Sequence, residues 1–226
     1  MGDWSSYALT DFMMFTSATY FRQYELVNAA LWPWQLGLQL LALAAIWVAL
    51  RAGRGGRLDG SLLLLAPAWL VSAWWFLHRQ YAPINLAADP VAWLFALQAS
   101  LLLAAALAGR RSAPCQTGRC LPGLILFVYA LIVHPLLGPL MGRSWSSLEV
   151  FGVAPDPTAL VTLAVVLTLN ARPAWWLVPL PLAWCVFSGL TYLAMDLGYG
   201  LVVPAAAMLA VALRIVSGRM ARGAAA

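Results

Sequence analysis

Long unbroken apolar segments, separated by short polar loops, are the feature that most restricts how this chain can fold. A window of about 19 residues places seven of them, at roughly 26–50, 61–78, 90–109, 121–141, 156–171, 173–193 and 197–216. Barrel strands alternate apolar and polar residues, so unbroken runs predict helices instead. Only 9% of the residues are charged, against about 25% in soluble domains, so most of the surface must face lipid. The sequence therefore predicts an all-α, polytopic membrane helix bundle with seven transmembrane helices.

The arginines predict the orientation of this bundle. All 13 basic residues are arginine, and ten of them fall in the odd-numbered loops and the C-terminal tail. The acids are distributed the other way, and Asp59 alone lies on the arginine-rich side. Arginine-rich loops stay in the cytoplasm, so we expect the N-terminus outside and the C-terminus inside. The expected location is a bacterial inner membrane, with the N-terminus in the periplasm.

The ends of the chain differ from its middle. Residues 1–24 are expected to form an amphipathic interfacial segment without a cleavable signal peptide, residues 25–217 the transmembrane domain, and residues 218–226 a short cytoplasmic tail. A helix capped by Thr16 or Ser17 and running to residue 50 would be about 51 Å long, more than a hydrocarbon core of about 30 Å. Its first turns should therefore lie in the outer interface, and Pro33 should kink it.

Several classes of function are disfavoured. The arginines lie in loops and build no basic face, so no nucleic-acid partner is expected. The chain has no lysine, which excludes a Schiff base to retinal or to any other carbonyl. No nucleotide-binding loop, serine-hydrolase motif or zinc-protease motif is present, so catalysis is disfavoured.

Polar residues repeat along two of the predicted spans. Glu25, Asn28 and Gln35 share one face of the first span, together with Gln39. Trp184, Ser188 and Thr191 share one face of the sixth. Polar groups in a span turn away from lipid. Two interpretations stay open, namely hydrogen bonds that hold the bundle together and the wall of a hydrophilic path.

The chain has two histidines, and both are expected in the outer part of the membrane. His78, with Arg79, ends the second predicted span at the outer face, and His134 lies about 20 Å up the fourth span. A structural hydrogen-bonding role is one interpretation. Metal binding by both histidines, completed by Glu25 or Asp156, is the other. A haem pair is disfavoured because the two depths do not match.

Asp156 lies between Pro155 and Pro157, at the start of an apolar segment that is too short to cross the membrane. This arrangement indicates that the turn dips below the outer surface, where a carboxylate is a functional candidate. Arg79, Arg143 and His134 are its potential partners. The alternative is a plain helix cap, with Pro157 at the first helical position.

Two of the three cysteines, Cys115 and Cys120, fall in an arginine-rich loop. We expect them to be cytoplasmic and reduced, with a transient soft-metal site as a weak alternative. Cys185 is expected to be an ordinary buried thiol.

Three segments resemble those of an uncharacterised bacterial family of multi-pass membrane proteins. They are the opening Asp11-Phe-Met-Met-Phe with Tyr24-Glu-Leu-Val-Asn-Ala-Ala-Leu-Trp-Pro, the stretch Tyr81-Ala-Pro-Ile-Asn-Leu-Ala-Ala, and the stretch Glu149-Val-Phe-Gly-Val-Ala-Pro-Asp-Pro-Thr-Ala. The resemblance implies the same topology and singles out Glu25, Asn85 and Asp156. It implies no activity, cofactor or substrate.

These features favour a small permease-like or channel-like protein for a small solute or cation. Its acidic outer vestibule would be built from Glu25, His78, Asp156 and Asp196. The alternatives are a non-catalytic subunit or assembly factor of a larger membrane complex, and a membrane enzyme acting on a lipid or quinone. The expected partners are the bilayer and, in some readings, further copies of the chain or other subunits. An enzyme should bring His134, Asp156 and Glu25 together, whereas a permease should have a polar cavity.

Overall fold

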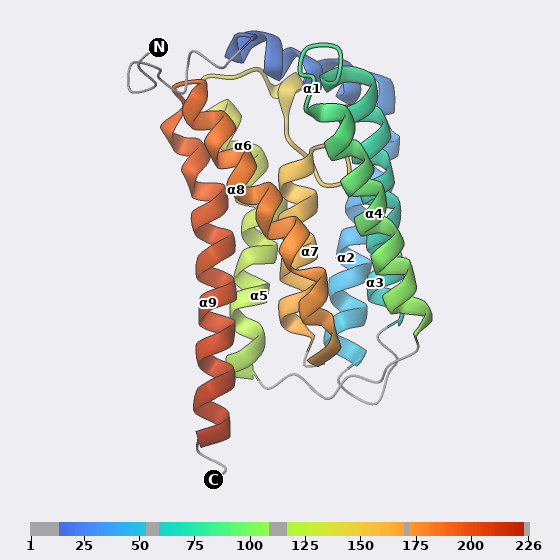
Figure 1. Ribbon diagram of the computed structural model, residues 1–226, viewed down its shortest axis with the longest axis vertical. Helices are drawn as coiled ribbons and strands as arrows, with labels where there is room; N and C mark the ends of the chain where they lie inside the picture. Colours follow the sequence, from blue (N-terminus) through green and yellow to red (C-terminus); the bar gives the residue numbers. More distant parts are fainter. Residues whose placement is uncertain (1–13, 53–58, 109–116, 170–171, 224–226) are drawn as a thin grey trace, which may run out of the picture.

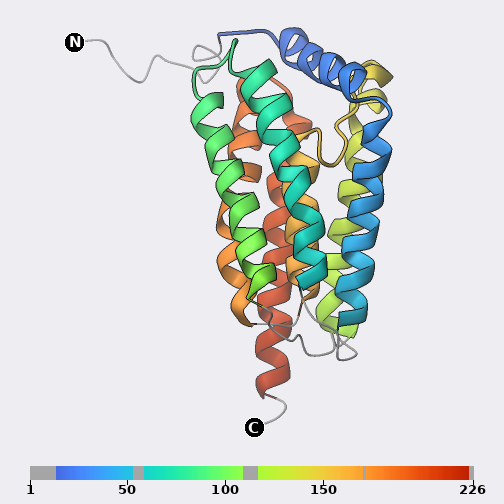
Figure 2. The ribbon, with the colours of Figure 1, turned by 90° about the vertical axis from the view of Figure 1, so that its right-hand side faces the viewer.

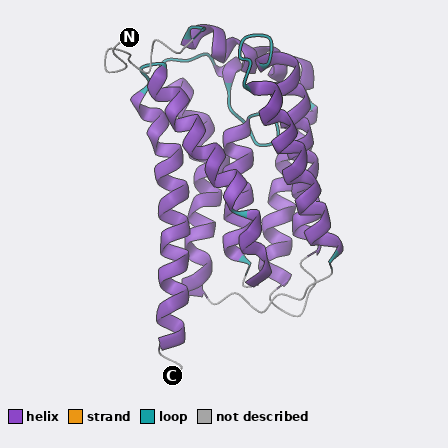
Figure 3. Cartoon of the chain, in the orientation of Figure 1, coloured by secondary structure: helices purple, strands orange, loops and turns teal. Residues whose placement is uncertain are grey.

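The computed structural model describes residues 14–52, 59–108, 117–169 and 172–223, and in these ranges the regular structure is helical throughout (Figure 3). In chain order the helices are α1 (Ser17–Leu31), α2 (Trp34–Ala52), α3 (Asp59–Val71), η3 (Ser72–Tyr81), α4 (Ala88–Leu107), α5 (Thr117–Val128), η4 (Tyr129–Val133), α6 (His134–Leu140), η5 (Trp145–Ser147), α7 (Pro155–Thr168), η6 (Arg172–Leu177), α8 (Pro179–Ala194), η7 (Gly198–Leu201) and α9 (Val202–Gly223). Both η3 and η4 are π-helical and continue the helices before them without a break.

Six stretches of helix in the described ranges are long and apolar enough to cross a membrane. They are Trp34–Arg51, Gly60–Tyr81, Ala88–Leu107, Cys120–Leu140, Trp175–Ala194 and Gly198–Ser217. Twenty helical residues span about 30 Å, the thickness of a hydrocarbon core. The six stretches run side by side, with α1 at one end of the bundle and the last turns of α9 at the other (Figures 1 and 2). We call these the α1 end and the α9 end.

The outside of the bundle is apolar. Leucine and tryptophan side chains such as Leu40, Trp47, Trp93 and Leu209 are exposed, which is the pattern expected where lipid is the solvent. The polar and charged side chains that the bundle buries lie inside it, among them His134, Glu149 and Asp156. The prediction of an all-α bundle with apolar helices of membrane length is therefore confirmed at this level.

The first span differs from its prediction. The chain does not form one kinked helix from residue 17 to 50. It breaks at Trp32 and Pro33, and α1 lies across the end of the bundle while α2 runs along it (Figure 2). Pro33 has no backbone N–H to donate, and α1 buries its own apolar face, including Tyr20, Tyr24 and Val27, on the bundle. The membrane-length stretch therefore begins at Trp34, and residues 26–31 belong to the transverse helix.

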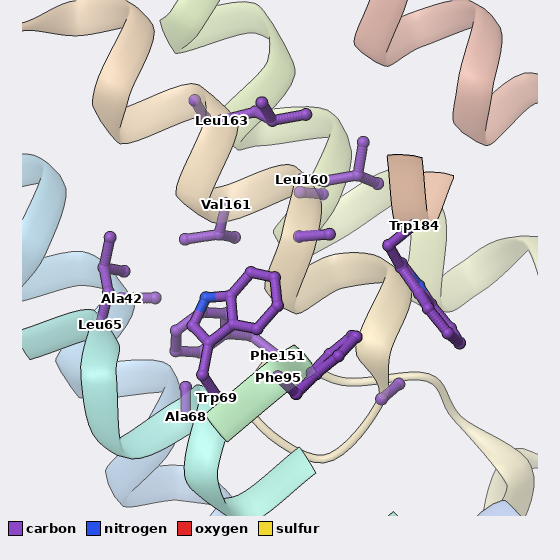
Figure 4. Close-up of a cluster of buried hydrophobic side chains, with 14 of the residues drawn as sticks. Ala42, Leu65, Ala68, Trp69, Phe95, Phe151, Leu160, Val161, Leu163 and Trp184 are labelled. Atoms are coloured by element: carbon purple, nitrogen blue, oxygen red, sulfur yellow. The ribbon is translucent and has the colours of Figure 1, made fainter. Parts of the chain in front are cut away.

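The short helix α7 forms the centre of the bundle. All 14 of its residues are buried, and Figure 4 shows Trp69, Phe95 and Trp184 beside Leu160 and Val161. The indole N–H of Trp69 donates to the Thr162 hydroxyl at 2.8 Å. Aromatic rings from three neighbouring segments thus fix the position of α7.

The segment before α7 enters the bundle from the α1 end and turns down into it before the helix begins (Figure 1). Its last turn needs Gly152, whose φ of +81° lies in the left-handed region. A Cβ at this position would also meet the Leu38 Cδ1 at 2.9 Å. The turn is held by the Thr158 hydroxyl, which accepts from the Gly152 N–H at 2.8 Å.

Replacing Gly152 by alanine should lower the free energy of unfolding by about 1–3 kcal/mol, because the side chain meets both strain and a clash. Thermal unfolding of the purified protein in detergent measures this loss. Gly37 provides the matched control, since it is helical and a Cβ there meets nothing within 4 Å. Gly37→Ala should be neutral or slightly stabilising, and equal melting temperatures for the two variants would contradict the account.

Candidate functional site

Three buried ionisable side chains meet at the centre of the fold, close to the N-terminus of α7. They are His134 at the start of α6, Glu149 in the non-helical segment that leads into α7, and Asp156 in the first turn of α7. We call this non-helical segment, residues 148–154, the descending segment. One potential ligand atom from each residue lies within 4.8 Å of the other two. No other group of three such residues lies this close in the described part of the chain. We call this group the acid–histidine centre.

Glu149 is held by a positive charge and a hydroxyl. Arg143 donates to the Glu149 Oε1 at 2.6 Å, and Tyr192 donates to the same oxygen at 2.8 Å. Burial opposes ionisation, but Arg143, His134 and Tyr192 together hold the pKa of the Glu149 carboxyl down, at about 2. Glu149 is therefore a carboxylate at neutral pH.

Arg143 reaches Glu149 because a neighbouring glycine makes room for it. A Cβ at Gly138 would lie 2.0 Å from the Arg143 Nη2, so only glycine fits there. The guanidinium also lies over the Phe21 ring of α1, 3.9 Å from its centroid, which is a cation–π distance. The bound guanidinium thus ties α1, α6 and the descending segment together.

Asp156 is held by two donors from α8. Trp184 donates to Oδ1 and Ser188 to Oδ2, each at 2.7 Å. The expected partners Arg79 and Arg143 do not bind it. It is not a helix cap either, because Ala154 is the N-cap residue of α7 and no side chain caps that position. The face of α8 that the sequence picked out is therefore the support of this carboxylate, although Thr191 bonds only within its own helix.

Several polar atoms of the acid–histidine centre have no hydrogen-bond partner. They are both ring nitrogens of His134, the Oε2 of Glu149 and the hydroxyl of Tyr129. The His134 Nε2 faces the Glu149 Oε2 at 3.4 Å, which exceeds the usual N–H···O range of about 2.7–3.2 Å. Unpaired buried polar atoms are costly, so this arrangement suits the binding of something further.

A pocket with both polar and apolar lining residues opens at the α1 end. It has an empty volume of about 680 Å³, including open solvent, and it is lined by Glu25, Asn28, Ala29, Trp32, Gln35, Trp145, Ser146, Leu148 and Val150. The polar stripe predicted on the first span therefore does line a hollow. Gln35 donates to the Asn28 side-chain oxygen at 2.9 Å, and Glu25 pairs with Arg22.

One extended segment separates this pocket from the acid–histidine centre. Along residues 147–151 the burial alternates: Leu148 and Val150 line the pocket, whereas Glu149 and Phe151 point into the bundle and are buried. Successive side chains of an extended chain point to opposite sides. A single extended stretch of backbone therefore separates the pocket from the acid–histidine centre. We call residues 147–151 the partition. Asn28 holds it by donating to the Leu148 carbonyl at 2.8 Å.

The remaining predicted site residues lie apart from the acid–histidine centre. His78 pairs with Asp89 at 2.5 Å, so it does not share a site with His134. Arg79 stacks on Trp75, 4.6 Å from the ring centroid. Asn85 donates to the Tyr81 hydroxyl at 2.7 Å and stabilises the turn before α4. Asp196 occupies the turn after α8, with a φ of +60°.

The predicted vestibule of Glu25, His78, Asp156 and Asp196 is therefore not assembled as one site. Glu25 lines the pocket at the α1 end, Asp156 lies in the acid–histidine centre, and His78 pairs elsewhere.

The cysteines require a correction. Cys120 is disulfide-bonded in the structure, so the expectations of a reduced thiol and of a soft-metal ligand there are wrong. Cys115 lies outside the described residues. Cys185 is a buried free thiol, as expected.

Sequence reasoning did not assign Glu149 or Tyr192 to a site, and it offered Arg143 as a partner of Asp156, whereas the structure pairs Arg143 with Glu149. The one signal for Glu149 was its position at the start of the segment that ends in Pro155-Asp156-Pro157. A carboxylate among Leu148, Val150 and Phe151 is itself unusual, because apolar neighbours in an extended chain imply that one side is buried.

The fold and the acid–histidine centre together define a helical protein with apolar helices long enough to cross a membrane and with a buried charged site. The chain belongs to a family of unknown function, DUF6064, whose profile matches residues 17–224. This confirms the resemblance to an uncharacterised family. No curated protein and no solved structure matches the chain.

Replacing Arg143 by methionine should lower the free energy of unfolding by about 3–5 kcal/mol, because it leaves the Glu149 carboxylate buried without its counter-charge. The matched control is Arg22→Met, which removes the exposed partner of Glu25 and should cost about 0–1 kcal/mol. Denaturation of both variants in detergent compares them. Similar losses would show that Arg143 does not compensate a buried charge.

Proposed function

We propose that the protein is a small permease-like carrier for a cation, with the acid–histidine centre as its binding site. The observation that supports this most strongly is the pair of fully buried carboxylates, Glu149 and Asp156, beside an unpartnered imidazole. Ionisable residues at membrane depth are costly and mark ion or proton pathways.

The charge balance supports a cation as the ligand. The two carboxylates of the acid–histidine centre formally carry two negative charges, and Arg143 is the one arginine bound to them in the described residues. One negative charge thus remains for a bound cation to balance. Asp156 itself accepts hydrogen bonds from neutral donors alone.

The backbone around the site also supports a carrier. The membrane-buried helix α7 is preceded by non-helical chain that enters the bundle (Figure 1). Helices that are interrupted at depth, with irregular backbone beside them, are typical of transporter binding sites. The pocket at the α1 end lies on the other side of the partition, so movement of the Leu148–Phe151 backbone would connect the two. Asn28 and Gln39 hold this segment through hydrogen bonds to Leu148 and Phe151. Because Arg143 and Tyr192 also bind Glu149 within it, such a movement has to keep or exchange those contacts.

We further propose that the chain crosses a bacterial inner membrane seven times, with the α1 end outside the cell membrane and the α9 end in the cytoplasm. The six membrane-length stretches and α7 supply the crossings, and the arginine distribution supplies the direction. The disulfide at Cys120 argues against this direction, because disulfides are rare in the cytosol.

A topology reporter decides between these two arguments. An enzyme fusion that is active only in the cytoplasm should work after Ala226 and at Gly118, and should be inactive after Ala88. Activity after Ala88 alone would reverse the orientation and would place Cys120 in the oxidising compartment.

Reconstitution into liposomes tests the carrier itself. Uptake of rubidium, of manganese and of protons, the last reported by a trapped pH-sensitive dye, should exceed that of empty vesicles for at least one ion. Asp156→Asn should reduce this uptake by about tenfold or more, since losing about 1.4 kcal/mol of ion binding is a factor of ten.

This substitution separates charge from structure. Asparagine can still accept from Trp184, and its amide can donate to the Ser188 hydroxyl, so the variant should fold. Asp89→Asn is the matched control, because Asp89 pairs with His78 away from the acid–histidine centre, and its uptake should equal that of the wild type. If none of the three ions enters faster than in empty vesicles, the carrier proposal fails.

One observation favours the alternative of an enzyme acting on a lipid or quinone. An apolar groove with an empty volume of about 490 Å³, including open solvent, lies between α5 and α9, lined by Pro122, Ile125, Leu126, Tyr129, Ala206, Leu209, Ala210 and Leu213. Tyr129 also contacts His134, with ring centroids 6.0 Å apart. A hydrocarbon tail in this groove would end beside the acid–histidine centre. Copurification of a lipid or quinone with the wild type, and its loss in Ala210→Phe, whose larger side chain fills the groove, would support this alternative.

A further inference from the structure

We infer that the acid–histidine centre is a binding site for a divalent transition-metal ion of the zinc or manganese class, with His134, Glu149 and Asp156 as its three protein ligands. The inference deepens the proposed function by naming the carried ion, and in that respect it rests on the proposal. The ligand site itself rests on geometry alone.

The spacing of the ligand atoms fits a metal better than a shared proton. Two ligand atoms bound about 2.0–2.2 Å from one tetrahedral ion lie roughly 3.3–3.6 Å apart. The His134 Nε2 and the Glu149 Oε2 are 3.4 Å apart. A proton held between them would draw the atoms into the hydrogen-bond range of about 2.7–3.2 Å. Asp156 offers a third ligand atom, and one ligand atom from each of the three residues lies within 4.8 Å of the other two, so the side chains need to close in on a bound ion.

The remaining contacts keep ligand lone pairs free and hold the carboxylates in place. Arg143 and Tyr192 both bind the Oε1 of Glu149, and this leaves Oε2 unpartnered. Trp184 donates to Oδ1 of Asp156 and Ser188 donates to Oδ2. Each carboxylate oxygen still has a second lone pair to offer a metal ion. Such outer contacts orient metal ligands. His134 departs from the usual pattern, because its second nitrogen also lacks a partner.

The ligand types define the class of ion. One imidazole and two carboxylates, without a thiolate, suit Zn²⁺, Mn²⁺, Fe²⁺ or Co²⁺ better than soft ions such as Cu⁺. Ca²⁺ requires six to eight oxygen ligands, which three side chains do not supply. Three protein ligands leave a fourth coordination position for a water molecule.

Metal titration of the full-length protein in detergent tests the site without any transport assay. After chelator treatment, Co²⁺ should bind at one ion per chain and give visible absorption bands from the bound ion. Zn²⁺ should displace it and should raise the melting temperature. His134→Gln and Asp156→Asn should each weaken Co²⁺ binding at least tenfold. The matched control is His78→Gln, which removes the other histidine and should bind as the wild type does.

The outcomes separate this inference from the carrier proposal. Absence of Co²⁺ and Zn²⁺ binding to the folded wild type overturns the inference, as does binding that survives His134→Gln but is lost in His78→Gln. Rubidium or proton uptake that depends on Asp156, without metal binding, supports the carrier proposal and overturns the metal-site inference. Stoichiometric binding that depends on His134, without uptake of any ion into liposomes, supports the metal site and removes the carrier. His134→Gln and Asp156→Asn both retain the buried Arg143–Glu149 pair, so a loss of Co²⁺ binding in these folded variants reports on the ligands themselves.

Discussion

The ion pair between Arg143 and Glu149 is the interaction on which the rest of the site depends. Two opposite charges removed from water need each other, because either one alone would be left buried without a partner. The pair joins the segment that follows α6 to the segment that precedes α7, and Tyr192 adds α8 through the same carboxylate oxygen. The guanidinium also packs on Phe21 of α1. One pair of charges therefore fixes how the transverse helix α1, the connection between α6 and α7, and α8 meet.

The aromatic residues under α1 complete this end of the fold. Tyr20 and Tyr24 are buried, share a hydrogen bond of 3.0 Å, and pack against Phe76 and Tyr192. Burial raises the pKa of both phenols, so they remain neutral and can lie close to the carboxylates without adding charge. The acid–histidine centre is thus covered from the α1 end by rings, and from the pocket by the partition alone.

The sequence predicted what depends on local pattern. The membrane-length helices follow from hydropathy, because that signal acts within a few residues. Pro33 marked the right place for a bend, but it did not show that α1 ends there and turns across the bundle. Asp156 was singled out by its two prolines and the short segment behind it, and the face of Trp184 and Ser188 was visible from its helical spacing. What the sequence could not supply were the partners. Glu149 was paired with neither Arg143 nor Asp156, because its inward direction depends on a non-helical segment entering the bundle. Glu25 was expected in a vestibule with His78, Asp156 and Asp196, because the first helix was taken to run straight into the bundle. The transverse course of α1 instead directs Glu25 to the pocket.

The partition has a consequence for how such a protein can evolve. Its alternate residues belong to different environments, with Leu148 and Val150 on the pocket and Glu149 on the acid–histidine centre. Substitutions at 148 and 150 can change the size and polarity of the pocket while the ligand geometry stays the same. Related proteins can thus differ in the solutes that their pocket accepts and still keep the same buried ionisable residues. The residues that set these two properties alternate along one short stretch of the chain.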